Sequence, residues 1–279
     1  MRIGICAPST PLWREDSDKV LAIAARDFPE AELVFDEQCF ATHGHFAGMD
    51  RQRADVFVNM ANDPAFDAIW FARGGYGACR IAEDVVARLN DAARAKVYLG
   101  YSDAGNMLGV LYRAGIAKVA HGPMPSDVKR MGGGAAVARS LAWLVRRDAA
   151  VLAPEARVEK HPLAAFNLMT LAMMAGTPLM PDLAGHVVMV EEVSEYLYAF
   201  DRALFHLTAH LAGHGLAGLR LGRVTDVPEN DRPFGEEPEE IAKRWCDRHG
   251  VAWMGRADIG HDVDNKVVPF GLASNWQGQ

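Results

Sequence analysis

Cysteine is scarce in this chain of 279 residues, which contains only four, namely Cys6, Cys39, Cys79 and Cys246. No two of them form a C-x-x-C pair, so the sequence suggests neither a zinc knuckle nor a thioredoxin-type redox motif. We interpret all four as reduced, mostly buried thiols.

Long apolar runs and basic stripes are absent as well. No stretch approaches the roughly twenty apolar residues of a membrane span, and the apolar segment that reaches Ala7 and then meets Pro8 is too short for a signal peptide core. The net charge is -7, with Lys and Arg scattered among acids. We therefore expect a cytoplasmic protein that binds neither membranes nor nucleic acid.

What the chain does have is hydrophobic content, at 50% of its residues, which is enough for one large domain or two ordinary ones. In its first half, short apolar runs alternate with segments of helical periodicity, a pattern typical of parallel βαβ units. We predict an α/β fold with an N-terminal Rossmann-like or flavodoxin-like parallel sheet. The expected strands lie at 3–7, 33–35, 68–72 and 97–100, and the expected helices at 16–26, 52–62, 79–89 and 104–114.

The run Gly132-Gly133-Gly134 and the break at Pro154 predict a division into two domains. We expect an N-terminal domain over 1–135, a linker region over 136–160, and a mixed α/β domain of the swivelling type over 161–279. In the second half, helices are expected at 168–175 and 198–211, an exposed acidic loop at 228–240, and strands at 187–190, 219–224, 252–255 and 266–269.

Ser102 ends the segment Val97-Tyr98-Leu99-Gly100-Tyr101-Ser102, which reads as a strand that delivers a serine into a turn before a helix. A serine placed there projects its hydroxyl from the sheet edge, beside the backbone N–H groups at the helix start. Ala104 stands where a nucleophile elbow has its second glycine. The segment alone favours the simpler explanation that Ser102 or Asp103 caps the helix, because capping is the common use of Ser and Asp before helices.

A second loop strengthens the case for a site. The strand expected at 68–72 leads into Arg73-Gly74-Gly75-Tyr76-Gly77, whose glycines let backbone amides approach a ligand. This loop fits neither phosphate-binding glycine motif. In an open parallel sheet, it and the Ser102 turn would share the edge where ligands bind.

A serine nucleophile needs a base and an acid that orients the base. His261 stands in a turn after a glycine, while Glu191 and Glu192 end the apolar strand expected at 187–190. Each also has a structural explanation, as a loop histidine or a solvated acidic turn. The histidines His206, His210 and His214 recur at helical spacing, but without a nearby acid they favour a surface or packing role over a metal site.

These segments, in this order, resemble the LD-carboxypeptidase family, also called peptidase family S66 or muramoyltetrapeptide carboxypeptidases. The resemblance runs through Ala7-Pro8-Ser9, His45-Phe46-Ala47-Gly48, Arg73 to Gly77, Gly100 to Asp103, His121 to Met124, Gly176-Thr177-Pro178, Val190-Glu191-Glu192 with Glu195, Asp201-Arg202 and Asp258 to His261. It departs at Ala165-Phe166, where the family commonly has two glycines before the asparagine that is Asn167 here, and at Gly105, where the family often has threonine.

The resemblance implies a Ser102-His261-Glu191 triad in an interdomain cleft, with Glu192 as a rival acid. It implies oxyanion donors at Gly75, with Gly74 as the alternative, and at Asp103. Arg73, Tyr76 and Asn167 are candidates for substrate binding, and Arg73 or Arg80 could bind the free carboxylate that a carboxypeptidase must recognise.

By the same resemblance, the expected reaction is hydrolysis of the L,D bond that releases terminal D-Ala from a murein tetrapeptide, free or attached to its anhydro-muropeptide sugars. We expect no metal and no organic cofactor, and we expect a homodimer. The alternatives are a related hydrolase of peptidyl-nucleotide antibiotics that confers self-immunity, and a non-catalytic murein-peptide binding protein.

Overall fold

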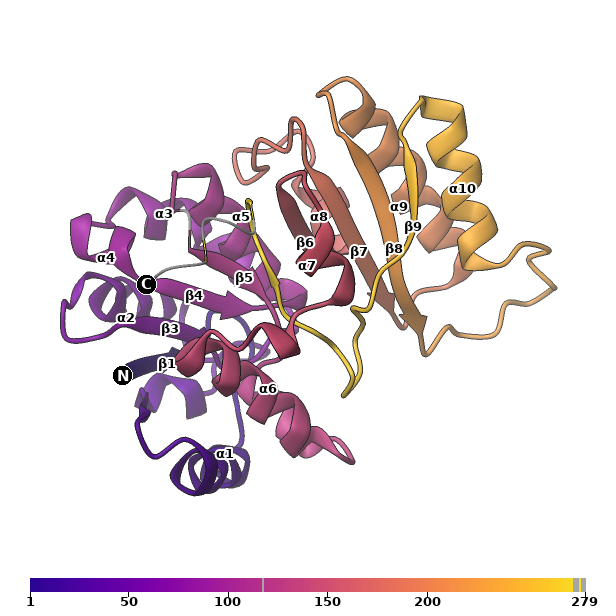
Figure 1. Cartoon of the computed structure of the whole chain (residues 1–279). Coiled ribbons are helices and arrows are strands. Elements are labelled where there is room, and N and C mark those ends of the chain that lie inside the picture. Colours follow the sequence, from indigo (N-terminus) through magenta and orange to yellow (C-terminus); the bar gives the residue numbers. More distant parts are fainter. Residues whose placement is uncertain (117, 273–275, 277–279) are drawn as a thin grey trace.

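The computed structural model describes residues 1–116, 118–272 and 276, and its strands form two sheets that lie side by side (Figure 1). The larger sheet has six strands in the order β10-β5-β4-β3-β1-β2, and the smaller has four in the order β6-β7-β8-β9. The strands are β1 (Arg2–Cys6), β2 (Glu32–Phe35), β3 (Ala68–Phe71), β4 (Val97–Gly100), β5 (Val119–His121), β6 (Leu163–Asn167), β7 (Val187–Val193), β8 (Gly218–Thr225), β9 (Trp253–Arg256) and β10 (Val268–Pro269).

The order β2-β1-β3-β4-β5 is that of a flavodoxin-like doubly wound sheet, and these strands are all parallel. β10 adds an antiparallel edge strand to β5. The smaller sheet is parallel throughout. The predicted fold class, a parallel α/β sheet followed by a second α/β unit, is therefore confirmed.

Helices cover both faces of the larger sheet, because its central strands alternate two apolar faces. Ile3 and Ile5 belong to one buried cluster with residues of α1 (Arg14–Asp27) and α6 (Gly133–Arg146). Cys6 and Phe71 belong to a second cluster, together with residues of α2 (Asp50–Asn62), α3 (Ala82–Ala87) and α5 (Gly105–Arg113).

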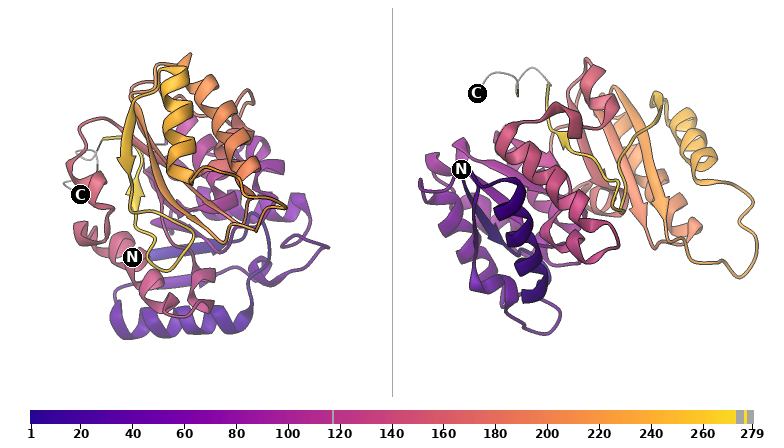
Figure 2. Two further views of the ribbon diagram at one scale, coloured as in Figure 1. Left: turned by 90° about the vertical axis from the view of Figure 1, so that its right-hand side faces the viewer. Right: turned by 60° about the horizontal axis from the view of Figure 1, so that its bottom comes forward.

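The remaining helices are short or belong to the smaller sheet. There α9 packs against both α8 and α10, and α10 also contacts β8, on the far side from the larger sheet (Figure 2). These helices are α4 (Asp91–Ala95), α7 (Pro154–Val158), α8 (Leu168–Met174), α9 (Leu197–Ala212) and α10 (Pro238–His249), with 3-10 turns η1 (Glu37–Phe40), η2 (Ala78–Arg80), η3 (Ser102–Ala104), η4 (Pro125–Lys129) and η5 (Ala149–Val151).

The region expected to be a linker, 136–160, contains most of α6 together with η5 and α7. It is not an extended connection, because Val137, Leu141 and Leu144 on one side of α6 are buried against the larger sheet. The segment expected as a strand at 266–269 yields β10, and this strand joins the larger sheet rather than the smaller one. α10 follows the acidic loop and begins with a capping box between Glu237 and Glu240, which the sequence interpretation overlooked.

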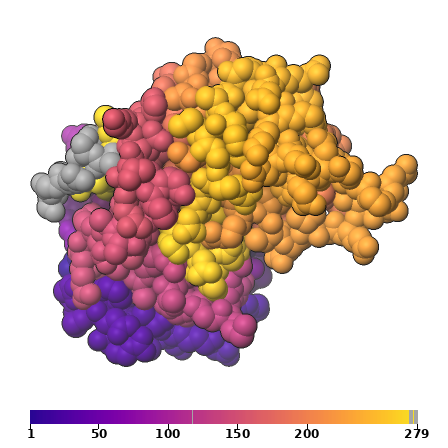
Figure 3. Space-filling view, turned by 45° about the vertical axis from the view of Figure 1, so that its right-hand side comes forward, coloured from indigo at the N-terminus to yellow at the C-terminus, as the bar shows by residue number. Residues whose placement is uncertain are grey.

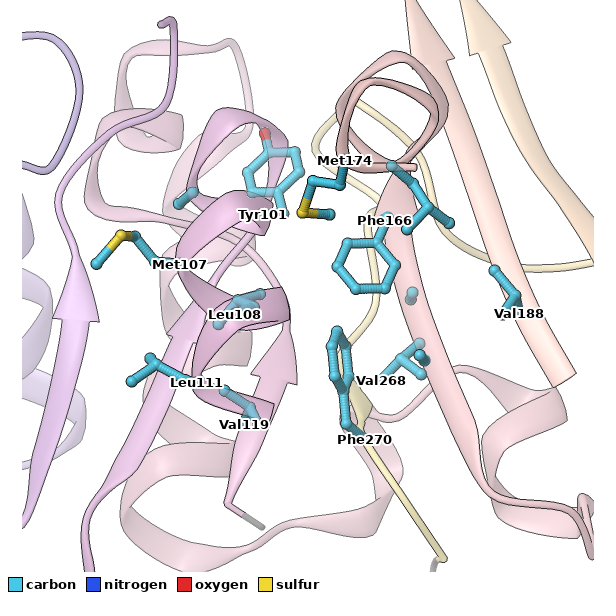
Figure 4. Close-up of a cluster of buried hydrophobic side chains, with 14 of the residues drawn as sticks. Tyr101, Met107, Leu108, Leu111, Val119, Phe166, Met174, Val188, Val268 and Phe270 are labelled. Atoms are coloured by element: carbon cyan, nitrogen blue, oxygen red, sulfur yellow. The ribbon is translucent and has the colours of Figure 1, made fainter. Parts of the chain in front are cut away.

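The two sheets share one apolar core. Between α5 and β5 on one side and β6 and β10 on the other lie buried side chains that include Leu108, Phe166 and Phe270 (Figure 4). The rings of Phe166 and Phe270 are 5.1 Å apart between centroids. On the surface, the chain between β9 and β10 runs across the boundary between the two halves (Figure 3). Among the described residues, no helix is long and apolar enough to cross a membrane.

Candidate active site

Ser102 stands at a strained turn between β4 and α5. Its φ is 59°, in the left-handed region that non-glycine residues seldom adopt. The turn η3 follows at once, and α5 continues from it. This is the strand, turn and helix arrangement that the sequence predicted, with a strained serine at its apex. Such strain is typical of functional positions.

The loop after β3 lies against this turn. A Cβ atom built on Gly74 would be 2.9 Å from the Ser102 Oγ, so the backbone approaches the hydroxyl more closely than any side chain would allow. Gly75 has a φ of 103°. Thr10 holds the loop in place, since its Oγ1 donates a hydrogen bond of 2.6 Å to the Gly74 carbonyl. In the described part of the chain, no backbone hydrogen bond engages the Gly75 N–H.

The Asp103 carboxylate has a structural task. It accepts hydrogen bonds from Ser9 Oγ at 2.6 Å and from the Ala78 backbone N–H at 2.9 Å on one oxygen, and from Asn106 Nδ2 at 3.1 Å on the other. These bonds tie together the segments that follow β1, β3 and β4. The fixed side chain positions the backbone of Asp103, whose N–H is the predicted oxyanion donor. The role of Ser9 was not predicted, although the residue was part of the recognised pattern.

His261 and Glu191 are in direct contact. The Nδ1 atom of His261 lies 3.1 Å and 3.3 Å from the two carboxylate oxygens of Glu191, which has no exposed surface. Burial lowers the pKa of His261, but the charge and hydrogen bond of Glu191 outweigh it, so the net pKa is raised. Arg130 also donates a hydrogen bond to the His261 carbonyl.

Glu192 points away from His261 and into a different set of contacts. Its carboxylate accepts hydrogen bonds from Asn167 Nδ2 at 2.7 Å, from the Met169 N–H at 2.8 Å and from its neighbour's N–H, that of Val193, at 2.9 Å. Burial raises the pKa of Glu192 to about 7 despite these donors. Of the two candidate acids, Glu191 is the one that contacts the imidazole.

Residues of the larger sheet support the imidazole from behind. The ring of Tyr101 lies 4.8 Å from that of His261 between centroids, which places His261 beside the Ser102 turn. The Tyr101 hydroxyl donates a hydrogen bond of 2.7 Å to Asp127. His121 contacts Asn265 at 3.1 Å, and Asn265 accepts a hydrogen bond from the Gly260 N–H at 3.2 Å. Burial lowers the pKa of His121 to about 4, so it is neutral at physiological pH.

A pocket of about 510 Å³ opens in front of Ser102. The carboxyl ends of β3, β4, β6 and β7 converge on it, so it lies between the two sheets. Of the predicted site residues, Ser102, Gly75, Asp103, Tyr76 and Asn167 line it. The other lining residues are Cys79, Asn106, Met169, Thr170, Met173, Thr177, Leu179, Glu192, Val193 and Glu195.

Tyr76 is the exposed aromatic side chain of this pocket, with half of its surface accessible. Its ring lies 6.1 Å from that of Phe46 and 6.3 Å from that of His45. The loop at 43–48 therefore supports the Tyr76 ring from the side. Asn167 has two roles, since it caps α8 by accepting the Thr170 N–H and also donates to Glu192.

Arg73 does not line the pocket. Its guanidinium donates a hydrogen bond of 2.9 Å to the carbonyl of Pro11. Arg80, the other cation considered for binding a carboxylate, pairs with Asp50 at 2.8 Å. Within the described ranges, no cluster of three or more His, Cys, Asp or Glu residues could hold a metal ion.

Comparison with known proteins shows what this arrangement is similar to. The LD-carboxypeptidase N-terminal domain of peptidase family S66 matches residues 3–122, and the LD-carboxypeptidase C-terminal domain matches residues 162–275. The murein tetrapeptide carboxypeptidase of Pseudomonas aeruginosa is 26% identical over 252 residues, which cover 85% of this chain and 81% of that protein.

Solved structures resemble the fold over almost the whole chain. Muramoyltetrapeptide carboxypeptidase from Oxalobacter formigenes superposes with a TM-score of 0.78 at 24% identity, covering 97% of this chain and 93% of that one. The microcin C7 self-immunity protein MccF, solved in complex with glutamyl sulfamoyl guanosine, superposes with a TM-score of 0.78 at 16% identity, covering 97% and 91%. At these identities the likeness concerns the fold.

Proposed function

Since this chain belongs to the LD-carboxypeptidase family, peptidase family S66, we propose that it is a serine carboxypeptidase acting on murein tetrapeptides. The reaction is hydrolysis of the bond between an L-configured centre and a terminal D-alanine, during recycling of cell-wall peptides in the cytoplasm. The observation that carries the proposal is the buried Glu191–His261 contact beside the strained Ser102 turn, at a pocket of about 510 Å³.

In this mechanism the Ser102 Oγ attacks the carbonyl carbon of the scissile bond while His261 Nε2 takes the hydroxyl proton. Glu191 accepts the hydrogen bond of Nδ1–H, which fixes the imidazole tautomer and stabilises the imidazolium. The imidazolium then protonates the leaving amino group, and D-alanine departs. Water, deprotonated by His261, attacks the acyl-enzyme ester, and the proton returns to Ser102 as the peptide leaves.

The oxyanion of each tetrahedral intermediate would accept hydrogen bonds from the backbone N–H groups of Gly75 and Asp103. Two arrangements favour this assignment: Thr10 holds the glycine loop beside the Ser102 side chain, and the Asp103 carboxylate is anchored by three donors. One such donor contributes typically about 3 kcal/mol to transition-state stabilisation.

The test is release of D-alanine from L-Ala-γ-D-Glu-meso-diaminopimelate-D-Ala, followed by mass spectrometry. We expect wild-type protein to release D-alanine and Ser102→Ala to lose at least about 10³-fold in rate. A wild-type protein that releases none, or a Ser102→Ala variant as active as wild type, would contradict the proposal. Thermal unfolding of both proteins controls for loss of the fold.

The same assay separates the alternatives. A non-catalytic peptide-binding protein would bind the tetrapeptide without releasing D-alanine, although the chain keeps all three residues of the proposed triad. A hydrolase of peptidyl nucleotides needs an aromatic surface on which the base can stack. Among the described residues that line the pocket, Tyr76 is the one aromatic side chain. A peptidyl-adenylate analogue added to the assay tests that reaction directly.

A further inference from the structure

Asp127 is a buried carboxylate that the proposed mechanism does not use. It lies on the turn η4 with 3% of its surface exposed. One of its oxygens accepts a hydrogen bond of 2.7 Å from the Tyr101 hydroxyl, and the other accepts one of 2.8 Å from the Met124 N–H. Arg130 Nε lies 3.3 Å from the first oxygen. Burial raises the pKa of Asp127 above its ordinary value, although these three partners oppose the rise.

The contacts of Asp127 form a closed ring that returns to His261 from two directions. On one side, the Tyr101 ring that Asp127 holds by its hydroxyl lies 4.8 Å from the imidazole between centroids, at an angle of 46°. On the other side, Arg130 approaches Asp127 with Nε and donates from Nη1 to the His261 carbonyl. The side chain and the backbone of His261 therefore depend on the same carboxylate.

The ring also includes the nucleophile through the covalent chain. Tyr101 directly precedes Ser102, so the side chain that packs against the base and the strained backbone that presents the hydroxyl belong to adjacent residues. The turn that carries Asp127 is fixed to the same sheet, because the Ser126 N–H donates a hydrogen bond of 3.1 Å to the Ala72 carbonyl at the end of β3. A shift of Asp127 would thus change the position of the imidazole relative to Ser102.

We propose that Asp127 is a positioning residue of the active site: through Tyr101 and Arg130 it holds His261 in register with Ser102, and its charge supports Glu191 in stabilising the imidazolium. Asp127 is not among the residues that line the pocket, so it acts without touching the substrate. The inference rests on the proposed carboxypeptidase function and adds a residue to the machinery around the base.

The charges that face His261 give this role a measurable sign. Burial lowers the pKa of His261, and the charge and hydrogen bond of Glu191 raise it by more. Asp127 raises the same pKa further, whereas Arg130 lowers it. His121, on β5, adds no charge at physiological pH because burial lowers its own pKa to about 4. Asp127 and Arg130 therefore act on the imidazole with opposite signs, which a loss of packing alone would not produce.

The first experiment measures D-alanine release by Asp127→Asn and Arg130→Gln from pH 5 to 9. Asparagine keeps the size of the side chain but removes its charge. For Asp127→Asn we expect kcat to fall about 10- to 100-fold with little change in KM, because a small misplacement of the base slows the reaction without weakening binding. The pH at which kcat/KM reaches half of its maximum, which reports the base of the free enzyme, should fall in Asp127→Asn and rise in Arg130→Gln.

Tyr101→Phe tests the positioning without removing a charge. It keeps the ring beside His261 but breaks the hydrogen bond to Asp127, and kcat should fall about tenfold. Tyr98→Phe is the matched control, because Tyr98 is a buried tyrosine of the same strand whose hydroxyl donates a hydrogen bond of 2.8 Å to the Ala93 carbonyl. Both variants should unfold at similarly lowered temperatures, but only Tyr101→Phe should lose kcat. An equal loss of kcat in both, or in neither, would overturn the inference.

Nuclear magnetic resonance titration of the imidazole provides a readout that does not depend on turnover. The His261 signal is assigned by its absence in His261→Asn, and its pKa should be lower in Asp127→Asn than in wild type. Asp16→Asn, which alters a buried carboxylate of α1 that pairs with Lys19, should leave that pKa unchanged.

The outcomes separate the two proposals. If wild type releases D-alanine and Asp127→Asn keeps the wild-type kcat and pH midpoint, the inference is wrong and the carboxypeptidase function stands. If wild type releases none but the pKa of His261 falls in Asp127→Asn, the hydrolytic proposal fails and the coupling of Asp127 to His261 stands. If neither is observed, both proposals are wrong.

Discussion

Replacement of Glu191 by glutamine is the most demanding test of the proposed triad. The change keeps the size of the side chain but removes the charge that lies 3.1 Å from His261 Nδ1 in a fully buried position. Removing one partner of a buried pair costs about 3 to 5 kcal/mol. The same amount, lost from the transition state in which His261 is an imidazolium, lowers kcat roughly 10²- to 10⁴-fold.

A second effect pushes the loss toward the upper end of that range. The glutamine amide can donate a hydrogen bond to Nδ1, which stabilises the tautomer with the proton on Nε2. A protonated Nε2 cannot accept the Ser102 proton. We therefore expect about a 10⁴-fold fall in kcat, with a much smaller change in KM.

The pH dependence of activity provides an independent test of the Glu191–His261 pair. In wild type, burial lowers the pKa of His261, but the charge and hydrogen bond of Glu191 raise it by more. The net pKa of His261 therefore lies above its ordinary value. A base must be neutral, so activity rises with pH through that raised pKa. Glu191→Gln removes the main influence that opposes burial, so the pKa of His261 should fall and the low residual activity should begin at a lower pH. Stopped-flow or discontinuous assays of D-alanine release from pH 5 to 9 give, for both proteins, the maximal rate and the pH at which half of it is reached.

Glu192→Gln tests which of the two neighbouring glutamates is the acid of the triad. Glu192 contacts Asn167 and Met169 and not His261, so its replacement should act mainly on KM. If Glu192→Gln loses kcat by 10⁴ while Glu191→Gln keeps more than a tenth of wild-type activity, the acid has been assigned to the wrong residue.

Three further changes test the surroundings. Gly74→Ala places a Cβ 2.9 Å from the Ser102 Oγ, so the rate of D-alanine release should fall at least about 100-fold. The free energy of unfolding in urea should change little. Full activity of this variant would show that the loop can move aside. Burial raises the pKa of Glu192 from 4.5 to about 7. Between these pH values the unfolded chain has lost the proton while the folded protein keeps it. The free energy of unfolding should therefore fall by about 3 kcal/mol as the pH rises through this range. Glu192→Gln should remove this pH dependence, which urea unfolding of both proteins at pH 4.5 and 8 measures. If the difference in unfolding free energy between wild type and Glu192→Gln is the same at both pH values, the prediction is wrong. Ser102→Gly should be about 1 kcal/mol more stable than Ser102→Ala, because glycine adopts a φ of 59° without strain, and equal midpoints would argue against strain at this turn.

The fold class could be predicted because its determinants are local. The buried runs at β1, β3 and β4 are short, apolar and followed by turn residues, so their positions and parallel arrangement follow from the sequence pattern. The Ser102 turn is readable for the same reason. His261 and Glu191 are not local features, and they were identified only through the resemblance to a known family.

The choice between Glu191 and Glu192 depended on tertiary structure. Both acids end the same apolar strand, and alternation along β7 sends them in opposite directions, one to His261 and the other to Asn167. A shift of one residue in register would exchange their roles. Sequence position alone could not fix that register, which depends on β6 and β8 on either side.

The reason for the glycines at the end of the first unit also lies in tertiary structure. The glycines at 132–134 predict a flexible joint, but Gly133 has no room for a side chain, since a Cβ would lie 1.9 Å from the Asp127 carbonyl oxygen. Close packing of α6 on η4, rather than flexibility, explains the glycine there. The contacts of Arg73 were equally invisible in the sequence, because they involve a backbone carbonyl 62 residues away.

The end of the chain explains how a site divided between two sheets keeps its geometry. After His261 the chain returns to the larger sheet, where Val268 pairs with His121 in β5. The same His121 contacts Asn265, which in turn accepts the Gly260 N–H directly before His261. His261, the proposed base, is therefore anchored on one side by Glu191 of the smaller sheet and on the other by the strand adjacent to the one that presents Ser102. Through β10 and Asn265, the position of His261 is thus tied to the sheet that presents Ser102.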